Sequence, residues 1–330
     1  MSQLKAYANA SPTSAKDSPL DSDAAVTSRC ITIGTETELV PVLVGSYIYF
    51  SASSTALMLS VLLSLCRDQK SRGKLAQKGA AKLLLHTYIS ITGDTPEDEV
   101  SRFTASHALS RFFITSEPSL IFPLWVFANS NNPCPFDQQG AWERYVHQTL
   151  GCFQKPFQYE TADLEVMVRS GSPPLSSTIR PLVTLLSPPP ESATNASNPR
   201  DLLPTFEALL ALTNLASTSD QKIGAQIIRL AAPQIEELVL SSNLRICRAA
   251  TELCCNLTLC PSGIALFASR TPEARRRLHI LLALADHEDA ATRRAAGGAI
   301  AGIVGDRTCY HAVIQRLSKG EIANECLVRR

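Results

Sequence analysis

The chain has 330 residues, of which 45% are hydrophobic and 18% are charged, so it can bury a large core and is not a disordered chain. Its 31 Lys and Arg residues nearly cancel its 30 Asp and Glu residues, which argues against a dedicated nucleic-acid binder. Aromatic residues make up only 6%, and Leu and Ala dominate the second half, a composition typical of helices packed on helices.

Residues 1–23 are rich in Ser, Ala and Asp and contain no long apolar run, so we expect a disordered tail and no signal peptide. The ten cysteines show no C-x2-C spacing of a zinc site. Several of them lie in apolar helical runs, where Cys behaves as a small buried hydrophobe. These features predict a cytoplasmic protein with free thiols and no metal site.

The stretch from Leu39 to Cys66 carries no charge and is long enough to span a bilayer. Pro41, Gly45 and a large number of hydroxyl side chains argue against a span. We therefore predict two short buried helices split near residues 45–54, and a membrane span remains the alternative.

Within residues 24–123, helices are predicted at 57–66 (the second of these two), at 75–91 and at 100–115, from apolar residues that recur every three or four positions. A turn with helix-start chemistry is expected at 94–99, which contains Pro96.

Residues 124–177 differ from the rest, because they hold both tryptophans and the Pro133-Cys134-Pro135 turn and show no sustained period. They are predicted to form a long irregular insertion. A second linker is predicted at 187–204, which contains five prolines and few apolar residues and should be mobile.

An internal repeat appears in the second half. Aligned Ala- and Leu-rich segments begin at Phe206, at Arg248 (42 residues later) and at Arg294 (46 residues later), and Phe103 begins a similar segment upstream. This period predicts an all-α, armadillo/HEAT-like right-handed α-solenoid with a long irregular insertion, whose C-terminal repeats occupy 178–330.

No catalytic constellation stands out, so an enzyme is the least favoured class. Gly297-Gly298 lacks the spacing and the strand of a nucleotide loop, and close helix packing is the better interpretation. Cys254-Cys255 and Cys309-Tyr310-His311 lack the surroundings of a known nucleophile. The histidines His107 and His279 are interpreted as core or rim residues.

Asn214 and Asn256 are the most informative polar residues, because each occupies the same place in its repeat, inside an apolar helix. A side-chain amide offers a donor and an acceptor, which match one peptide unit of an extended chain. The alternative is that each amide is satisfied within its own stack. The basic clusters at 275–277 and 293–294 are interpreted as a solvated face, with contact to a partner as the alternative.

The segment Phe206-Glu-Ala-Leu-Leu-Ala-Leu-Thr-Asn-Leu-Ala-Ser217 resembles the UCS domain, the armadillo-repeat module of myosin-directed chaperones. Further similar segments are Cys66-Arg-Asp-Gln-Lys-Ser-Arg-Gly-Lys-Leu, Ala108-Leu-Ser-Arg-Phe-Phe-Ile-Thr-Ser-Glu-Pro, Ile179-Arg-Pro-Leu-Val-Thr-Leu-Leu, Arg248-Ala-Ala-Thr-Glu-Leu-Cys-Cys-Asn-Leu and Arg293-Arg-Ala-Ala-Gly-Gly-Ala. Together they span about residues 24–123 and 178–305. The chain resembles the fungal type, which has no tetratricopeptide region.

The resemblance implies a cytosolic protein that binds myosin motor domains and assists their folding together with Hsp90, contacted directly or indirectly. It implies no cofactor, no small-molecule substrate, no nucleic acid and no catalysis, and a membrane partner is not expected. In armadillo proteins the Asn of the third helix holds the backbone of a bound segment. That role carries over onto Asn214 and Asn256, with Glu252, Arg248 and Arg294 as neighbours on related helix faces.

Two alternatives remain beside the chaperone. A scaffold of the armadillo type could bind linear peptides without chaperone activity, although nuclear-import relatives carry a Trp four residues before each groove Asn, where this chain has Leu210 and Glu252. The family also continues for at least one repeat beyond Val304, so we expect the 178–330 module to be truncated. A nonfunctional fragment is therefore the second alternative.

Overall fold

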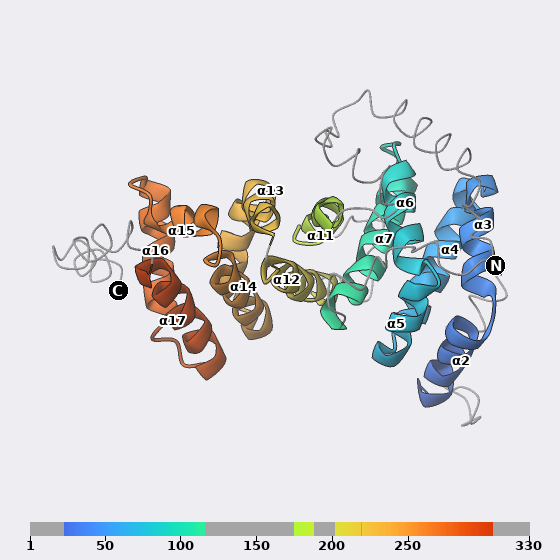
Figure 1. Cartoon of the computed structure of the whole chain (residues 1–330), viewed down its shortest axis with the longest axis horizontal. Coiled ribbons are helices and arrows are strands. Elements are labelled where there is room, and N and C mark those ends of the chain that lie inside the picture. The colour runs from blue at the N-terminus through green and yellow to red at the C-terminus, as the bar shows by residue number, and fades with distance from the viewer. Residues whose placement is uncertain (1–22, 116–174, 188–201, 219, 306–330) are drawn as a thin grey trace. The chain divides into compact units, whose positions relative to one another are not determined.

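A computed structural model describes residues 23–115, 175–187, 202–218 and 220–305 (Figure 1). These residues form α-helices and 3-10 helices and contain no strand. The chain divides into two compact units, Met1–Glu207 and Ala208–Arg330, and the boundary falls within helix α12 (Leu203–Ala216). The predicted all-α class is confirmed for the part of the chain that the structure describes.

Unit 1 is a stack of helices around α7. Its elements are α2 (Asp23–Glu36), α3 (Leu39–Ser46), η2 (Tyr47–Tyr49), α4 (Ala52–Leu65), α5 (Gln69–Gln77), α6 (Ala80–Ser90), α7 (Pro96–Thr115), η3 (Leu175–Thr178), α11 (Ile179–Thr184) and the first turn of α12. Helix α7 packs against α4, α5, α6 and α11. Leu109, Phe112 and Phe113 on α7 are fully buried, so this helix forms the centre of the core.

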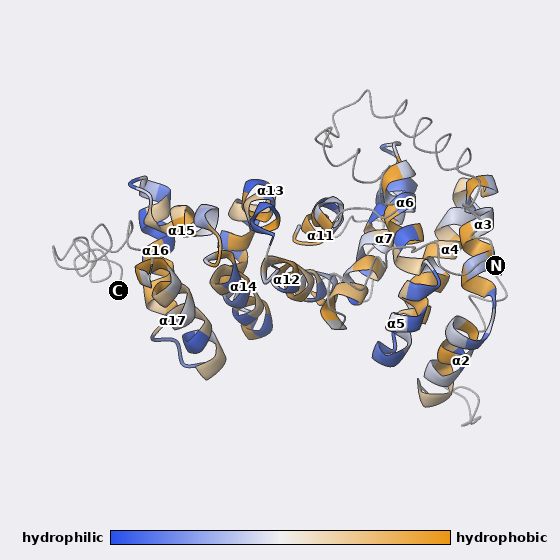
Figure 2. Cartoon of the chain, in the orientation of Figure 1, coloured by the Kyte–Doolittle hydropathy of each residue, from blue (hydrophilic) through white to orange (hydrophobic). Residues whose placement is uncertain are grey.

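Unit 2 continues with α13 (Gln221–Val239), α14 (Leu244–Leu257), α15 (Pro261–Ala268), α16 (Pro272–Leu284) and α17 (Ala290–Gly305). Helix α14 packs against α13, α15 and α17, and α15, α16 and α17 pack against one another as a triplet. Figure 2 shows hydrophilic and hydrophobic residues side by side on these helices, as expected where one face of each helix is buried. We call α4, α7, α12, α14 and α17, which close successive repeats, the third helices.

The uncharged stretch forms two helices, as the sequence predicts. Helix α3 ends at Ser46, η2 follows, and α4 begins after Ser51, whose side chain accepts a hydrogen bond from the backbone N–H of Ser54. The prediction that this stretch is buried is only partly right, because Val42, Ile48 and Tyr49 are exposed. Among the described helices, none is by itself long and apolar enough to cross a membrane, and the pair α14 and α15, bent by 114°, passes that test by length and composition only.

The predicted helix over 75–91 is wrong, because the chain breaks there into α5 and α6. The break lies at Gly79, whose φ of 91° belongs to the left-handed region that favours glycine. The predicted turn at 94–99 is shorter than expected, since α7 already begins at Pro96. Thr95 and Asp98 cap that start, with each side chain accepting a hydrogen bond from the other residue's backbone N–H.

Several predictions concern residues outside the described part. They are the tail predicted at 1–23, of which only residue 23 is described, and the insertion predicted at 124–177, of which only residues 175–177 are described. Most of the linker at 187–204, the Cys309-Tyr310-His311 cluster and the C-terminal module after Gly305 also lie outside. The described residues at the linker's end, Leu203 and Pro204, belong to α12 and not to a loop.

Glycine is required at position 263, where α15 turns back over the end of α14. A Cβ atom there would overlap the backbone carbonyl of Leu257. In contrast, Gly297 on the exposed side of α17 has nothing within 4 Å of such an atom.

We therefore predict that Gly263→Ala lowers the free energy of unfolding by about 1–3 kcal/mol, because the overlapped backbone must shift. Gly297→Ala is the matched control and should raise it by about 0.5–1 kcal/mol, since Ala is the better helix former. Urea unfolding followed by circular dichroism checks both, and equal effects of the two changes would contradict the packing described.

Candidate functional site

Three of the five predicted site residues lie in one row on α14. Arg248, Glu252 and Asn256 are spaced by four residues, so they share one face of the helix, and each is half-buried. Asn214 on α12 is also half-buried, and Arg294 on α17 is exposed. We call the surface formed by these five residues the third-helix face.

Arg248 is committed to an ion pair within the stack. Its Nε and Nη2 atoms donate to the two carboxylate oxygens of Asp289, at 3.1 and 2.6 Å. Asp289 also accepts hydrogen bonds from the backbone N–H and the hydroxyl of Thr292, in the first turn of α17. These contacts, with the Arg248 guanidinium first, hold the pKa of the Asp289 carboxyl well below its usual range. Arg248 therefore ties α14 to the start of the next third helix.

Asn256 uses half of its amide inside the stack. Its Nδ2 atom donates to the backbone carbonyl of Thr213 on α12, at 3.0 Å. The sequence left open the alternative that the amide is satisfied within its own stack. For Asn256 this holds for the NH2 group, which is the donor of the amide. Its Oδ1 atom accepts no hydrogen bond from the described residues, so this acceptor is available to a partner.

Two charged groups of the third-helix face are not used by the fold. Neither Glu252 nor Arg294 makes a hydrogen bond or an ion pair within the described part of the chain. The face therefore offers a carboxylate, a guanidinium and the Asn256 carbonyl oxygen.

Close packing of α14 and α17 explains two of the glycines. A Cβ atom on Gly298 would lie 2.9 Å from Sγ of Cys255, and one on Gly302 would lie 2.6 Å from Oγ1 of Thr258. This confirms the interpretation of Gly298 as a packing residue. Gly297, its neighbour, makes no such approach.

The adjacent Cys254 and Cys255 thiols are not activated nucleophiles. Burial raises the pKa of the Cys254 thiol to about 12, and burial together with the Glu252 carboxylate raises the pKa of Cys255. A thiol with a raised pKa stays protonated and is a poor nucleophile near neutral pH. No group of three or more His, Cys, Asp or Glu side chains suited to a metal ion occurs among the described residues.

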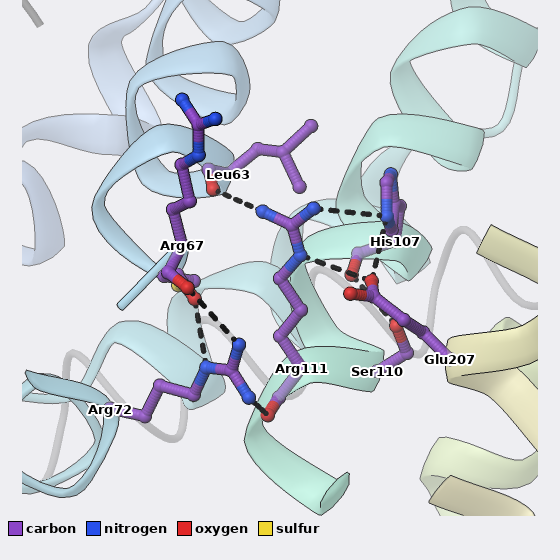
Figure 3. A network of polar contacts seen from close by, with 8 residues as sticks. Leu63, Arg67, Arg72, His107, Ser110, Arg111 and Glu207 are labelled. Carbon is purple, nitrogen blue, oxygen red and sulfur yellow. Dashed lines mark hydrogen bonds and ion pairs between the residues drawn. The ribbon is translucent and has the colours of Figure 1, made fainter. Parts of the chain in front are cut away.

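A second polar cluster lies in unit 1 and is structural (Figure 3). Glu207 at the start of α12 accepts hydrogen bonds at one carboxylate oxygen from His107 Nε2 at 2.8 Å and from Arg111 Nε at 3.0 Å, both on α7. Arg111 Nη1 also donates to the backbone carbonyl of Leu63 on α4 at 3.0 Å. Because Nε2 faces a carboxylate, it carries the proton. His107 is thus a core residue, as predicted.

Arg72 on α5 extends this cluster with three donations to backbone carbonyls. Its Nε donates to Cys66, Nη2 to Arg67 and Nη1 to Arg111, at 2.8, 3.3 and 3.0 Å. Burial is the main cause that lowers the pKa of Arg72, but its usual pKa is so high that the group keeps its charge. Sequence reasoning missed Arg72 and Arg111 as structural residues.

The Glu207 carboxylate has a lowered pKa. Burial alone would raise it, but the hydrogen bond from His107 and the charge of Arg111 outweigh burial. A carboxyl whose pKa is lower in the folded chain than in the unfolded one stabilises the fold above the unfolded pKa of about 4.3. That contribution is lost as the pH falls through the lower, folded pKa.

We predict that Glu207→Gln lowers the free energy of unfolding at pH 7 by about 1.5–3 kcal/mol, because two hydrogen bonds lose their charged acceptor. Glu237→Gln, on the exposed side of α13, is the matched control and should change little. Urea midpoints measured at decreasing pH check this. The difference between Glu207→Gln and the unchanged chain should shrink below pH about 4, and a constant difference would contradict the assignment.

Comparison with known proteins gives two kinds of relatives, although no family model matches the chain. It is 29% identical to protein unc-45 homolog B of Xenopus tropicalis over 247 residues, which cover 74% of this chain and 19% of that protein. It is 40% identical to Ring assembly protein 3 of Schizosaccharomyces pombe over 134 residues, covering 39% and 17% respectively. The chain therefore spans about a fifth of the length of the curated relatives it matches.

Solved structures agree on the fold. The crystal structure of She4p matches with a TM-score of 0.65 and 22% identity, covering 97% of this chain and 37% of that one. A structure of the myosin chaperone UNC-45 from C. elegans in complex with an Hsp90 peptide matches with a TM-score of 0.61 and 20% identity, covering 96% and 29%. The predicted armadillo-like helical-repeat fold is confirmed by these likenesses. The chain is a homologue of the UNC-45 proteins and of Ring assembly protein 3, so the resemblance to the UCS-domain family of myosin-directed chaperones, first recognised in its sequence, is confirmed.

Proposed function

We propose that this chain is a myosin-directed co-chaperone, which binds the motor domain of myosin and assists its folding together with Hsp90. The observation that carries the proposal is the similarity to UNC-45 homolog B over three quarters of the chain. The C. elegans UNC-45 structure, described as that of a myosin chaperone with an Hsp90 peptide, supports both partners. A cytoplasmic location and the absence of catalysis and of cofactors belong to the same proposal.

The third-helix face provides the chemistry for holding a client segment. Glu252 can accept a hydrogen bond or pair with a cation, and Arg294 can pair with an acidic side chain. The Oδ1 atom of Asn256 can accept a hydrogen bond from a backbone N–H of an extended segment. Two of the three guanidinium nitrogens of Arg248 donate to Asp289, so Arg248 would contact a client through Nη1. Its ion pair also holds α14 beside the start of α17.

Heat-induced aggregation of a purified myosin motor domain tests this function, with citrate synthase as an unrelated client. Suppression that is specific to the motor domain is the expected result. Equal protection of both clients would indicate only an exposed apolar surface and would contradict the proposal. No protection of either client, by a chain that circular dichroism shows to be folded, would favour the alternative below.

The alternative is a scaffold of the armadillo type that binds linear peptides without chaperone activity. The half-free amide of Asn256 supports it, because an amide acceptor suits any extended backbone. Binding of unfolded motor-domain peptides without protection of the folded motor would identify this second function.

We predict that Glu252→Gln and Arg294→Gln each weaken binding of the motor domain about 3- to 10-fold, which corresponds to about 0.7–1.4 kcal/mol. The urea midpoint should not change, because neither side chain is used by the fold. Glu237→Gln and Arg275→Gln are the matched controls, since both residues are exposed and lie outside the third-helix face. Titration calorimetry checks the affinities, and unchanged affinity for both site variants would show that clients bind elsewhere.

A further inference from the structure

The connection between α15 and α16 carries one of the two Thr-Pro dipeptides in the sequence, which are Thr95-Pro96 and Thr271-Pro272. Each Thr lies directly before a helix, and each Pro is the first residue of that helix. Both threonines are exposed. Neither dipeptide has a part in the proposed function, and the two differ in the state of the hydroxyl group and in the charge around it.

The backbone at Thr271 is extended. Its φ of −80° and ψ of 154° lie in the polyproline II region, as do the φ of −61° and ψ of 158° of Ser269. Pro272 is one cause, because a proline disfavours the helical conformation in the residue before it. An extended, exposed segment can enter the cleft of an enzyme, whereas a residue inside a helix would first have to unfold.

The Thr271 hydroxyl has its proton available. Its Oγ1 accepts a hydrogen bond from the backbone N–H of Ala274 at 3.2 Å, and it donates to no residue in the described ranges. The Thr95 hydroxyl, in contrast, donates to Oδ2 of Asp98 at 2.8 Å. In phosphoryl transfer the acceptor hydroxyl gives its proton to an aspartate of the kinase. Asp98 already competes for that proton at position 95, so position 271 is the better acceptor.

The charge around the two threonines is opposite in sign. Residues 269–277 contain four Arg and one Glu, a formal charge of +3. Residues 93–101 contain four acidic residues and no basic one, a formal charge of −4. A phosphate carries a charge of about −1.5 to −2 near neutral pH, so it is stabilised beside arginines and repelled beside carboxylates. The surroundings of position 271 therefore suit a phosphate, and those of position 95 do not.

Two of the arginines around Thr271 are free to meet a phosphate. Arg270 and Arg275 are exposed, and neither side chain makes a hydrogen bond or an ion pair with a described residue. The backbone N–H of Arg275 donates to the carbonyl of Thr271 at 3.1 Å, which places the Arg275 side chain one turn after Thr271. A cation so close to the start of a helix is unfavourable, because the helix start is itself positive. A phosphate at Thr271 would remove this disadvantage.

We propose that Thr271 is phosphorylated by a proline-directed Ser/Thr kinase and that its phosphate pairs with Arg275. In the transfer, Oγ1 of Thr271 forms a bond to the γ-phosphorus of ATP, the bond from that phosphorus to the β–γ bridging oxygen breaks, and ADP leaves. The hydroxyl proton passes to the catalytic aspartate of the kinase. Pro272 supplies the feature that such a kinase recognises beside the acceptor. The inference does not depend on the proposed function.

Incubation of the full chain with an active mitogen-activated protein kinase and Mg-ATP tests the proposal. Mass spectrometry has to resolve the sites, because the sequence also contains four Ser-Pro dipeptides. Thr271 should be phosphorylated, and Thr95 should carry about tenfold less phosphate. Pro272→Ala should lower the rate at Thr271 about tenfold, because the kinase pocket loses the proline ring. Circular dichroism checks that this variant is folded, and a standard peptide substrate checks that the kinase is active.

Urea unfolding tests the pairing with Arg275. The phosphorylated chain should unfold at a higher urea concentration than the unphosphorylated one, and Arg275→Gln should remove this difference. Arg245→Gln is the matched control, because Arg245 is an exposed arginine in the first turn of another helix, α14, and it should leave the difference unchanged.

Three outcomes would overturn the assignment of Thr271 as a kinase site. They are the absence of phosphate at Thr271, equal phosphate at Thr95 and Thr271, and an unchanged rate in Pro272→Ala. A stabilisation by phosphate that persists in Arg275→Gln would overturn the pairing with Arg275.

Discussion

Backbone carbonyls near the ends of the third helices are the groups on which the described stack depends. The last four carbonyls of a helix have no partner within that helix, so they accept from residues beyond its end or from a neighbouring helix. The carbonyl of Thr213, for instance, accepts from the backbone N–H of Ser217 at 3.1 Å, and the next third helix adds a second donor. In unit 1, Arg111 donates to the carbonyl of Leu63, and in unit 2, Asn256 donates to that of Thr213. The two donors occupy the same position of the repeat, which is filled by a guanidinium in one case and an amide in the other.

The same constraint explains why the position is filled differently on α17. There the equivalent residue is Gly302, which has no side chain to donate. The carbonyl of Cys255 on α14 instead accepts a hydrogen bond from the hydroxyl of Thr258 at 2.7 Å, and Gly302 lets α17 come close to that hydroxyl. A large donor at 302 would overlap Thr258. The α4–α7 and α12–α14 pairs thus use a long side chain across the gap, whereas the α14–α17 pair uses a hydroxyl and a close approach.

Sequence patterns predicted the repeat, its third helices and their shared face, because apolar period and repeat spacing are local properties of the chain. They could not show which polar side chains of that face are hydrogen-bonded or ion-paired within the fold. The partner of Arg248 is Asp289, 41 residues away, and it is recognisable only once α17 is known to begin beside α14. An Asp followed three residues later by Thr292 is a plausible helix start, so a search for caps one repeat after each Arg could have found this pair. The break at Gly79 was likewise invisible to an apolar period that continues on both sides of it.

The difference between polar groups that are bonded within the fold and those that are not bears on the proposed function. A residue that holds the stack together cannot be exchanged freely for one that fits a client better, because its loss exposes a carbonyl or a carboxylate inside the stack. Glu252 and Arg294 make no hydrogen bond or ion pair within the described part of the fold. Under the proposed function they can therefore vary with the client without loss of stability. Arg248 and the donor half of Asn256 set the position of the row, and Glu252, Arg294 and the acceptor half of Asn256 are the groups left to read what binds there. Under the proposed function, client specificity belongs to the residues that the fold does not need.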